Sequence, residues 1–407
     1  MTYQELFAVF EEIESPLFTN RRFKQEDIEP TLKELPFEKE VIGQSFEKRN
    51  IYKVKIGSGK IHVLLWSQMH GNEATATMAI FDIFRFFAET SNAFTSLIKE
   101  HLTLHFVPMI NPDGAERFIR RTAQQIDMNR DAVALVCPES KLLKRLHDEL
   151  KPAFSFNLHD QSVRYAAGET RNQAAMSFLA TAYDKETSWN KNRTKAMQII
   201  CEMNAILQSL IPDKVGRFSD EFEPRAFGDN IQKWGSSLIL VESGGYGGDI
   251  EKMYLRKLHF IVILKALESI ASASYANRKL DEYNAIPLNT KCLFDLLIRN
   301  AELDGEKMDI GINLDEVNNS NATAFEYKST VEDMGDLSTF WGIKELDATG
   351  LKVESLKGFS EILTPYKLTN EDFGRLEIEK KANFALTKIG ELHHLILNGE
   401  LFPAPEN

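Results

Sequence analysis

Two histidines and a glutamate stand where they could bind a metal ion. His70 and Glu73 lie three residues apart in the run His-Gly-Asn-Glu, and a turn that enters a helix can direct both side chains to one ion. His159 follows much later, after the apolar run 153–158. Two imidazoles and one carboxylate are the protein ligands of a catalytic zinc site, which leaves a fourth position for water. The three cysteines are far apart and form no C-x-x-C pair, so we expect no cysteine metal site.

Glu242 could act as a general base beside such a metal. It follows the apolar run 238–241 and precedes a glycine-rich segment, which is a position where a carboxylate is partly removed from water. A carboxylate in that position can take a proton from an attacking water molecule and return it to a leaving amine. The metal ligands and this acid together predict a hydrolase.

Arginines gather in the segment from residue 111 to residue 131, which begins with the turn Asn-Pro-Asp-Gly. The segment contains Arg117, Arg120, Arg121 and Arg130. Guanidinium groups bind carboxylates through two parallel hydrogen bonds and can also stabilise an oxyanion. This loop therefore favours a substrate that carries a free carboxylate.

Five motifs, in this order, resemble those of the zinc carboxypeptidases of the carboxypeptidase A type, the funnelins. The motifs are HGNE, NPDG, DMNRD, NLHD and LVES, and the resemblance covers about residues 50 to 270. It implies that His70, Glu73 and His159 bind one zinc ion and that Glu242 is the general base. It also implies that the substrate is a peptide, or an acylated amino acid, with a free carboxylate.

The same resemblance implies roles for residues that bind the substrate. Asn129 and Arg130 match the pair that holds the terminal carboxylate of the substrate. An upstream arginine polarises the carbonyl that is cleaved, and here that residue is Arg120 or, as the close alternative, Arg121. Members of the family carry a mobile tyrosine before the catalytic glutamate, whereas residues 212–241 contain no tyrosine. Tyr246, which follows the glutamate, is a candidate to replace it.

Strands that alternate with helices must position these residues. Apolar runs predict strands at 51–55, 61–67, 102–110, 153–158 and 237–241, and helical periodicity predicts helices at 74–88, 141–150, 191–210 and 253–273. This order predicts an α/β fold with a mixed, mostly parallel sheet flanked by helices. His70, His159 and Glu242 all follow strands, and sites in such sheets lie beyond the carboxyl ends of the strands. We therefore expect the three residues to meet at one edge.

The character of the chain changes near residue 277, where short β-like runs separated by turns replace the helical pattern. We predict an N-terminal extension over residues 1–50 that packs on a catalytic domain at 51–276, and a β-sandwich accessory domain at 277–407. The runs 294–305 and 308–312 faintly resemble the β-sandwich of amidohydrolases, without the metal motif of their catalytic barrel.

Composition limits the class of partner. The chain has 407 residues and a net charge of −12, which argues against nucleic acid or an anionic membrane as the main partner. We see no signal peptide and no run that approaches the roughly 18 apolar residues of a membrane span, so a cytoplasmic location is the simplest expectation.

Three functions remain open from the sequence. The first is a metallocarboxypeptidase, a zinc metallopeptidase. The second is a deacylase or amidase that acts on N-acyl amino acids or cell-wall peptides, which the missing tyrosine and the short interval between His70 and His159 favour. The third is a binding protein without activity, which should have lost a metal ligand or the base, whereas all four residues are present.

Overall fold

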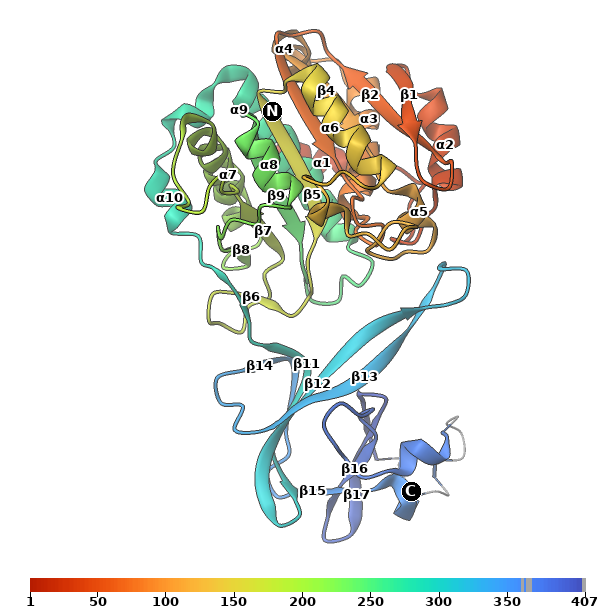
Figure 1. The fold of residues 1–407 in the computed structure, drawn as a ribbon. Helices are drawn as coiled ribbons and strands as arrows, with labels where there is room; N and C mark the ends of the chain where they lie inside the picture. The colour runs from red at the N-terminus through yellow and green to blue at the C-terminus, as the bar shows by residue number, and fades with distance from the viewer. Residues whose placement is uncertain (360–361, 364–367, 405–407) are drawn as a thin grey trace. The chain divides into compact units, whose positions relative to one another are not determined.

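An eight-stranded sheet forms the centre of residues 1–289 in the computed structural model (Figure 1). Its strands lie in the order β1-β2-β4-β3-β5-β9-β7-β8. They are β1 (Glu38–Gln44), β2 (Asn50–Ile56), β3 (Ile61–Trp66), β4 (Leu102–Val107), β5 (Phe154–Asp160), β7 (Met176–Leu179), β8 (Val215–Arg217) and β9 (Ser237–Ser243). The central strands β4, β3, β5 and β9 are parallel, whereas β2 pairs with β4, and β7 with β9, in antiparallel fashion. The predicted mixed sheet is confirmed.

Helices cover both faces of this sheet (Figure 1). They are α1 (Tyr3–Ile13), α2 (Gln25–Glu34), α3 (Thr75–Glu89), α4 (Ala93–His101), α5 (Pro112–Glu116), α6 (Pro138–Leu150), α7 (Lys191–Leu210), α8 (Phe227–Lys233), α9 (Met253–Ser272) and α10 (Leu280–Asn284). Trp66 of β3 belongs to a buried cluster with Leu143 of α6 and Phe227 of α8. Phe106 of β4 lies on the opposite face, where its ring contacts Phe84 of α3. The central strands are apolar on both sides because both faces are covered.

The long elements follow the sequence pattern closely. The predicted strands correspond to β2, β3, β4, β5 and β9, and α7 has the predicted bounds 191–210. The short strands β7 and β8, of four and three residues, carry too few residues for a periodic pattern. The N-terminal residues pack on the same body of structure, since the Phe10 ring of α1 lies 5.4 Å from the Phe260 ring of α9.

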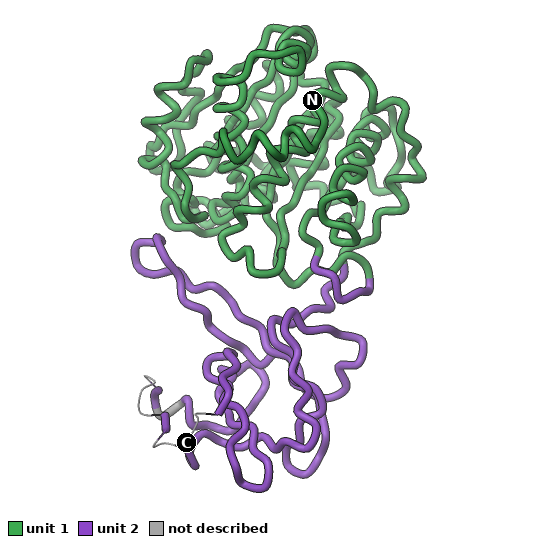
Figure 2. The backbone as a smooth tube through the Cα atoms, turned by 180° about the vertical axis from the view of Figure 1, so that it is seen from behind, with its two compact units in different colours: residues 1–168, 174–289 green, residues 169–173, 290–407 purple. Residues whose placement is uncertain are grey.

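The structure describes residues 1–359, 362–363 and 368–404, and the chain divides into two units (Figure 2). Unit 1 comprises residues 1–168 and 174–289, and unit 2 comprises residues 169–173 and 290–407. The division after residue 289 lies 12 residues beyond the change in pattern that we placed near 277, because α10 still belongs to unit 1. The short strand β6 (Tyr165–Ala167) lies outside the main sheet.

Unit 2 contains a second sheet with the strand order β13-β12-β11-β15-β16-β17-β18, and β14 also pairs with β11. Its strands are β11 (Leu293–Leu303), β12 (Glu306–Asn318), β13 (Phe325–Gly335), β14 (Trp341–Asp347), β15 (Lys352–Glu354), β16 (Phe384–Lys388), β17 (Glu391–Leu397) and β18 (Glu400–Pro403), and β10 (Asn289–Lys291) precedes them. Most pairs are antiparallel, and a separate core forms around Ile298, Ile312 and Phe384. The β-sandwich and the likeness to amidohydrolases stay predictions.

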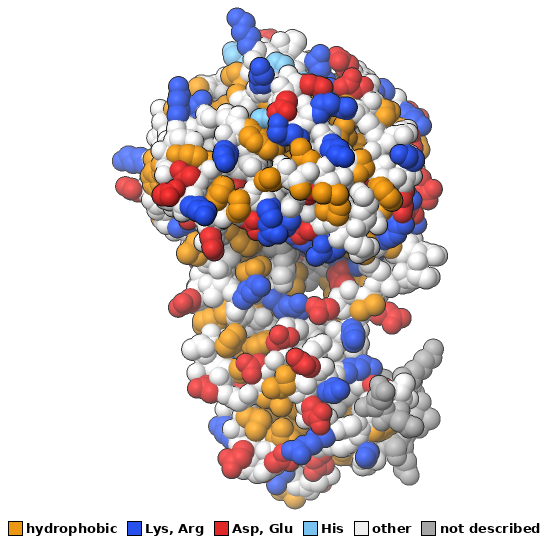
Figure 3. All heavy atoms as spheres, in the orientation of Figure 1, with side chains coloured by type: hydrophobic (Ala, Val, Ile, Leu, Met, Phe, Trp, Pro, Cys, Tyr) orange, Lys and Arg blue, Asp and Glu red, His pale blue; other side chains and the backbone are white. Residues whose placement is uncertain are grey.

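Charges of both signs are interspersed with apolar side chains on the face of the molecule shown in Figure 3. In the described part of the chain, no helix combines the length and the apolar character that crossing a lipid bilayer requires.

Candidate metal centre

The carboxyl ends of β3, β5 and β9 bring the predicted site residues together. His70 and Glu73 lie in the turn between β3 and α3, where the Glu73 amide donates a hydrogen bond to the His70 carbonyl at 3.1 Å. His159 and Glu242 lie on the neighbouring strands β5 and β9, in a directly registered pair. Registered residues of parallel strands point to the same face, so the metal ligand and the acid stand side by side.

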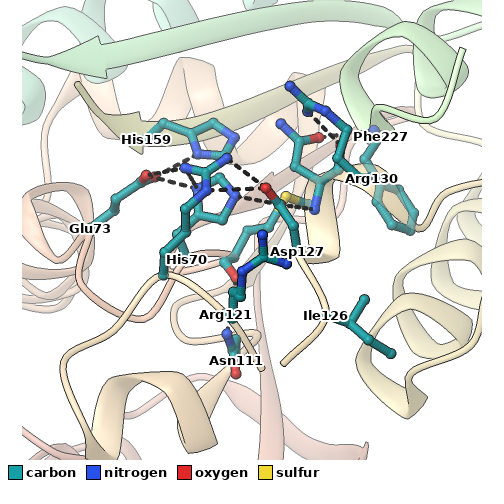
Figure 4. A network of polar contacts seen from close by, with 12 residues as sticks. His70, Glu73, Asn111, Arg121, Ile126, Asp127, Arg130, His159 and Phe227 are labelled. Carbon is teal, nitrogen blue, oxygen red and sulfur yellow. Dashed lines mark hydrogen bonds and ion pairs between the residues drawn. The ribbon is translucent and has the colours of Figure 1, made fainter. Parts of the chain in front are cut away.

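The glutamate joins the two histidines. His70 Nδ1 lies 2.7 Å from Glu73 Oε1, and His159 Nδ1 lies 2.6 Å from Glu73 Oε2. The relative exposure of the three residues is 2%, 7% and 2% in sequence order, and Figure 4 shows their side chains turned toward one another. One potential ligand atom from each residue lies within 4.8 Å of the other two. A single ion can therefore reach all three residues.

Asp127 fixes which nitrogen of His70 is directed at the metal position. His70 Nε2 lies 3.1 Å from Asp127 Oδ1 (Figure 4). Burial opposes the charge on Asp127, but His70 and Arg120 hold the pKa of this carboxyl well below its ordinary value. An ionised carboxylate only accepts hydrogen bonds, so Nε2 carries the hydrogen and Nδ1 is the nitrogen that can lose its proton. Metal-binding histidines are commonly held this way by a carboxylate on the other ring nitrogen.

The donor set suits zinc. Burial opposes ionisation of Glu73, but the two imidazoles hold its pKa well below the ordinary value, so the carboxylate is charged. Burial also lowers the pKa of His70, and Glu73 and Asp127 outweigh that effect, so the net pKa is raised. In the metal-free protein His70 therefore binds a proton more readily than an ordinary histidine does. Two imidazole nitrogens and a carboxylate oxygen are ligands that zinc accepts.

Glu242 faces the same position from β9. Its Oε2 is buried and has no hydrogen-bond partner among the residues that the structure describes. Burial raises the pKa of Glu242 to about 8, and His159 opposes the rise. A carboxyl group held in this way binds a proton readily, as a residue that moves protons must.

Arg120 is the arginine that lies at the metal ligands. Its Nε and Nη2 donate to Asp127 Oδ2 at 3.1 and 2.9 Å, and its Nη1 lies 3.3 Å from Glu73 Oε1. Arg121 instead donates to the carbonyl of Gln125 at 3.0 Å, within its own loop. The structure thus places Arg120, and not its neighbour, beside the triad.

Asn129 and Arg130 lie where their loop packs against the start of α8 (Figure 4). Asn129 Oδ1 accepts a hydrogen bond from the Phe227 amide at 3.0 Å. Arg130 is partly exposed, at 39% of its side-chain area, and its Nε lies 3.2 Å from Glu223 Oε2. A substrate carboxylate would have to share this guanidinium with Glu223, so the role of the pair stays a prediction.

Tyr246 is partly buried, and its ring stacks at a tilt on the Tyr254 ring at 4.8 Å. Its role in binding the substrate also stays a prediction.

The sequence did not single out Asp127, although the residue lies in the DMNRD motif. Its Oδ1 also accepts the backbone N–H of Asn129 at 3.0 Å, so it shapes the turn η1 (Met128–Arg130) that follows it. An acid two residues before Asn129 was the available signal, but only the folded chain shows that it faces His70.

Comparison with known proteins identifies a family that matches the part of the chain with the metal ligands. Residues 35–204 match the family described as zinc carboxypeptidase. This range includes His70, Glu73 and His159 and ends before Glu242. The match therefore covers the metal ligands. The place of Glu242 beside them follows from the register of β5 and β9.

Curated relatives are similar over a short stretch. Carboxypeptidase 2 of Trichophyton tonsurans is 26% identical over 118 residues, which is 29% of this chain and 22% of that protein. Carboxypeptidase 2 of Trichophyton rubrum is 26% identical over 115 residues, which is 28% of this chain and 21% of that protein. The chain thus spans about a fifth of the length of the curated relatives that it matches.

Solved structures with a similar arrangement include two carboxypeptidases. A metallocarboxypeptidase from Burkholderia cenocepacia has a TM-score of 0.49 at 15% identity, covering 62% of this chain and 70% of that chain. Carboxypeptidase A from Helicoverpa armigera has a TM-score of 0.49 at 15% identity, covering 68% of this chain and 82% of that chain.

Proposed function

We propose that this chain, whose residues 35–204 match the family described as zinc carboxypeptidase, hydrolyses an amide or peptide bond next to a free carboxylate. The observation that carries the proposal is the buried triad of His70, Glu73 and His159 with Glu242 registered beside it. Bound at the triad, zinc supplies a Lewis acid that polarises a carbonyl and makes water more acidic.

Glu242 moves the proton in this proposal. Its carboxylate takes a proton from the attacking water and later donates it to the leaving amine. A free Oε2 and a raised pKa support this role, because no protein donor holds the oxygen and the group keeps a proton readily. The registered neighbour His159 keeps the acid next to the metal position.

Arg120 stabilises the negative charge that develops on the carbonyl oxygen. Its side chain is 45% exposed, so a substrate can reach it, and Asp127 holds it through Nε and Nη2. The remaining nitrogen, Nη1, points at the metal ligands and can turn to the oxygen of a bound substrate. Preorganised donors of this kind contribute about 3–4 kcal/mol to catalysis.

Asn129 and Arg130 bind the free carboxylate of the substrate. A bidentate contact from Arg130 would replace its contact with Glu223, and the exposed guanidinium makes this exchange accessible.

The proposal is tested with the 407-residue chain loaded with zinc. We expect one zinc per chain and release of C-terminal residues from a mixed peptide panel. Glu242→Gln should keep the zinc and lose at least about a hundredfold in kcat/KM, because proton transfer contributes that much or more. His159→Ala should lose the zinc. A wild-type protein without stoichiometric zinc, or a Glu242→Gln variant with full activity, would contradict the proposal.

A second candidate is hydrolysis of an N-acyl amino acid or of an amide in a cell-wall peptide. The absence of tyrosine from residues 212–241 favours it, since a tyrosine in that stretch belongs to the peptide-cleaving pattern. Peptides and N-acyl amino acids should be compared, each with a matched substrate whose carboxylate is amidated. Cleavage of N-acyl amino acids alone rejects the exopeptidase, and equal cleavage of the amidated substrates rejects carboxylate recognition by Arg130.

A further inference from the structure

A buried lysine contacts the ends of the two strands that carry His159 and Glu242. Lys252 immediately precedes α9 and is 4% exposed. Its backbone has a left-handed conformation with φ 56° and ψ 32°, which is uncommon for a residue other than glycine. Lysine is almost never fully buried without a partner, because removing its charge from water is costly.

The ammonium group of Lys252 joins two strand ends. Its Nζ donates to the carbonyl of Ser243 at 2.9 Å and lies 3.4 Å from Asp160 Oδ2. Asp160 directly follows the metal ligand His159, and Ser243 directly follows Glu242. Asp160 and Ser243 are the last registered pair of β5 and β9, so the lysine spans the two strands where they reach the site.

Asp160 extends this contact to the third element of the site. Its backbone N–H donates to Glu73 Oε2 at 3.3 Å, and its Oδ2 accepts the hydroxyl of Thr75, the first residue of α3, at 2.7 Å. The side chains of Lys252 and Asp160 are each 5% exposed, so solvent screens their ion pair little. One buried ion pair thus connects the ends of β5 and β9 with the start of α3.

The charged side chains around the metal position indicate a second, electrostatic effect of Lys252. Four acidic side chains gather at the site, and two cationic side chains face them. The acids are Glu73, Asp127, Asp160 and Glu242, and the cations are Arg120 and Lys252. Loss of the lysine would leave the buried Asp160 carboxylate without its cationic partner.

We propose that Lys252 is a positioning residue of the metal centre: it fixes the ends of β5 and β9 and so sets the places of His159 and Glu242. This inference rests on the zinc site of the proposed function, but it concerns how this chain builds that site. The lysine acts through its contacts with Asp160 and Ser243.

Zinc affinity of the full chain, measured by competition with a coloured chelator, tests the proposal without any substrate. Lys252→Met should weaken zinc binding by about 10- to 100-fold, as loss of residues that orient metal ligands does. Lys252→Arg, which keeps the charge and a donor, should restore part of the affinity. Zinc binding by Lys252→Met at the wild-type level would overturn the proposal.

Lys257→Met is the matched control. Lys257 lies in the first turns of α9, is 5% exposed and pairs with Glu11 of α1. It should lose folding stability and keep zinc affinity. An equal loss of zinc affinity in this control would show that any damage to α9 has the same effect, and would overturn the specific role of Lys252.

A double variant covers the case in which Lys252→Met folds poorly. Lys252→Met combined with Asp160→Asn removes both charges, so no buried charge is left unpaired. We expect folding stability to recover and zinc affinity to stay reduced, because the connection between the strand ends is still absent. Recovery of wild-type zinc affinity would mean that the lysine only neutralises Asp160. A wild-type protein that binds zinc and cleaves no substrate would reject the proposed function and leave this test intact.

Discussion

Each oxygen of the Glu73 carboxylate faces one imidazole nitrogen, at 2.7 Å for His70 and 2.6 Å for His159. The three ligand side chains therefore converge on one position before any ion binds. The orientation of His70 depends in turn on Asp127, which also holds Arg120. At the scale of single residues, one acid outside the triad thus contacts both the metal ligand His70 and Arg120, the proposed oxyanion donor.

Asp127→Asn should weaken zinc binding by about 10- to 100-fold, as loss of a carboxylate behind a metal-binding histidine does. The asparagine oxygen can still accept from His70, but its NH2 group would face the donors of Arg120 and repel them. Chelator competition gives the zinc affinity, and kinetics with the zinc-loaded protein give the loss in kcat. Asp131→Asn in the same motif is the control, because Asp131 accepts from the amides of Val136 and Cys137 and not from His70. Equal losses in both variants would contradict the role of Asp127.

Glu242 should make the stability of the metal-free protein depend on pH. Burial raises its pKa from the ordinary 4.5 to about 8, so between these values the folded state holds a proton that the unfolded state has released. Folding stability contributed by this group therefore falls as pH rises from about 4.5 to about 8.

Glu242→Gln removes that dependence, because glutamine does not ionise. In chelator-treated protein the variant should gain on the order of 3 kcal/mol relative to wild type between pH 5 and pH 8. Urea unfolding at the two pH values gives the difference, and the other titrating groups are common to both proteins. The same difference at both pH values would contradict an elevated pKa.

At the scale of elements, the turn from β3 into α3 depends on its glycine. A Cβ atom on Gly71 would lie 1.9 Å from the Gly114 carbonyl carbon and 2.2 Å from the Ala115 nitrogen. The two turns that carry HGNE and NPDG therefore contact each other through backbone atoms. Backbone atoms cannot move aside as a flexible side chain can. This contact fixes the positions of His70 and Glu73 relative to the arginine-containing segment 111–131.

Gly71→Ala should cost about 1–3 kcal/mol of folding stability, the usual effect of overpacking. It should also weaken zinc binding, because the turn that carries two ligands must shift. Thermal unfolding and chelator competition measure the two effects. Gly247→Ala is the control, since nothing lies within 4 Å of a Cβ atom at that glycine. Normal zinc affinity in Gly71→Ala would show that the turn tolerates the shift.

The sequence predicted the elements whose apolar pattern is long enough to read. The central strands are short apolar runs bounded by turns, and α7 is a periodic stretch of 20 residues. β7 and β8 were not predicted, because a run of three or four residues fits either a strand or a loop. The metal ligands were predictable because they follow strands and match motifs, and the place of Glu242 beside them was predictable because it lies at the end of a neighbouring strand.

Partners that meet only in the folded chain were not predictable. Asp127 is 57 positions from His70, and no spacing rule selects it among the acids of the loop. Arg120 and Arg121 are adjacent in a segment without periodicity, so the sequence left both open. Lys252 stands before a helix like many solvated lysines, and its burial follows from the way β5 and β9 end together.

At the scale of the whole molecule, the two units have separate sheets and separate cores. Among the described residues, the group that could hold a metal ion lies in unit 1. A ligand stabilises only the folded part that binds it, by about 2.7 kcal/mol when its free concentration is a hundred times Kd. Zinc should therefore act on unit 1 alone.

Calorimetric unfolding of the full chain tests this expectation. We expect two transitions, and zinc should move one of them to higher temperature while the other stays in place. The moving transition should belong to unit 1, so its shift should disappear in His159→Ala, which lacks a metal ligand but keeps both cores. Proteolysis during heating, followed by mass spectrometry, would assign each transition to unit 1 or unit 2. A single transition that zinc moves as a whole would show instead that the two units unfold together, and that the metal centre stabilises the β-rich unit as well.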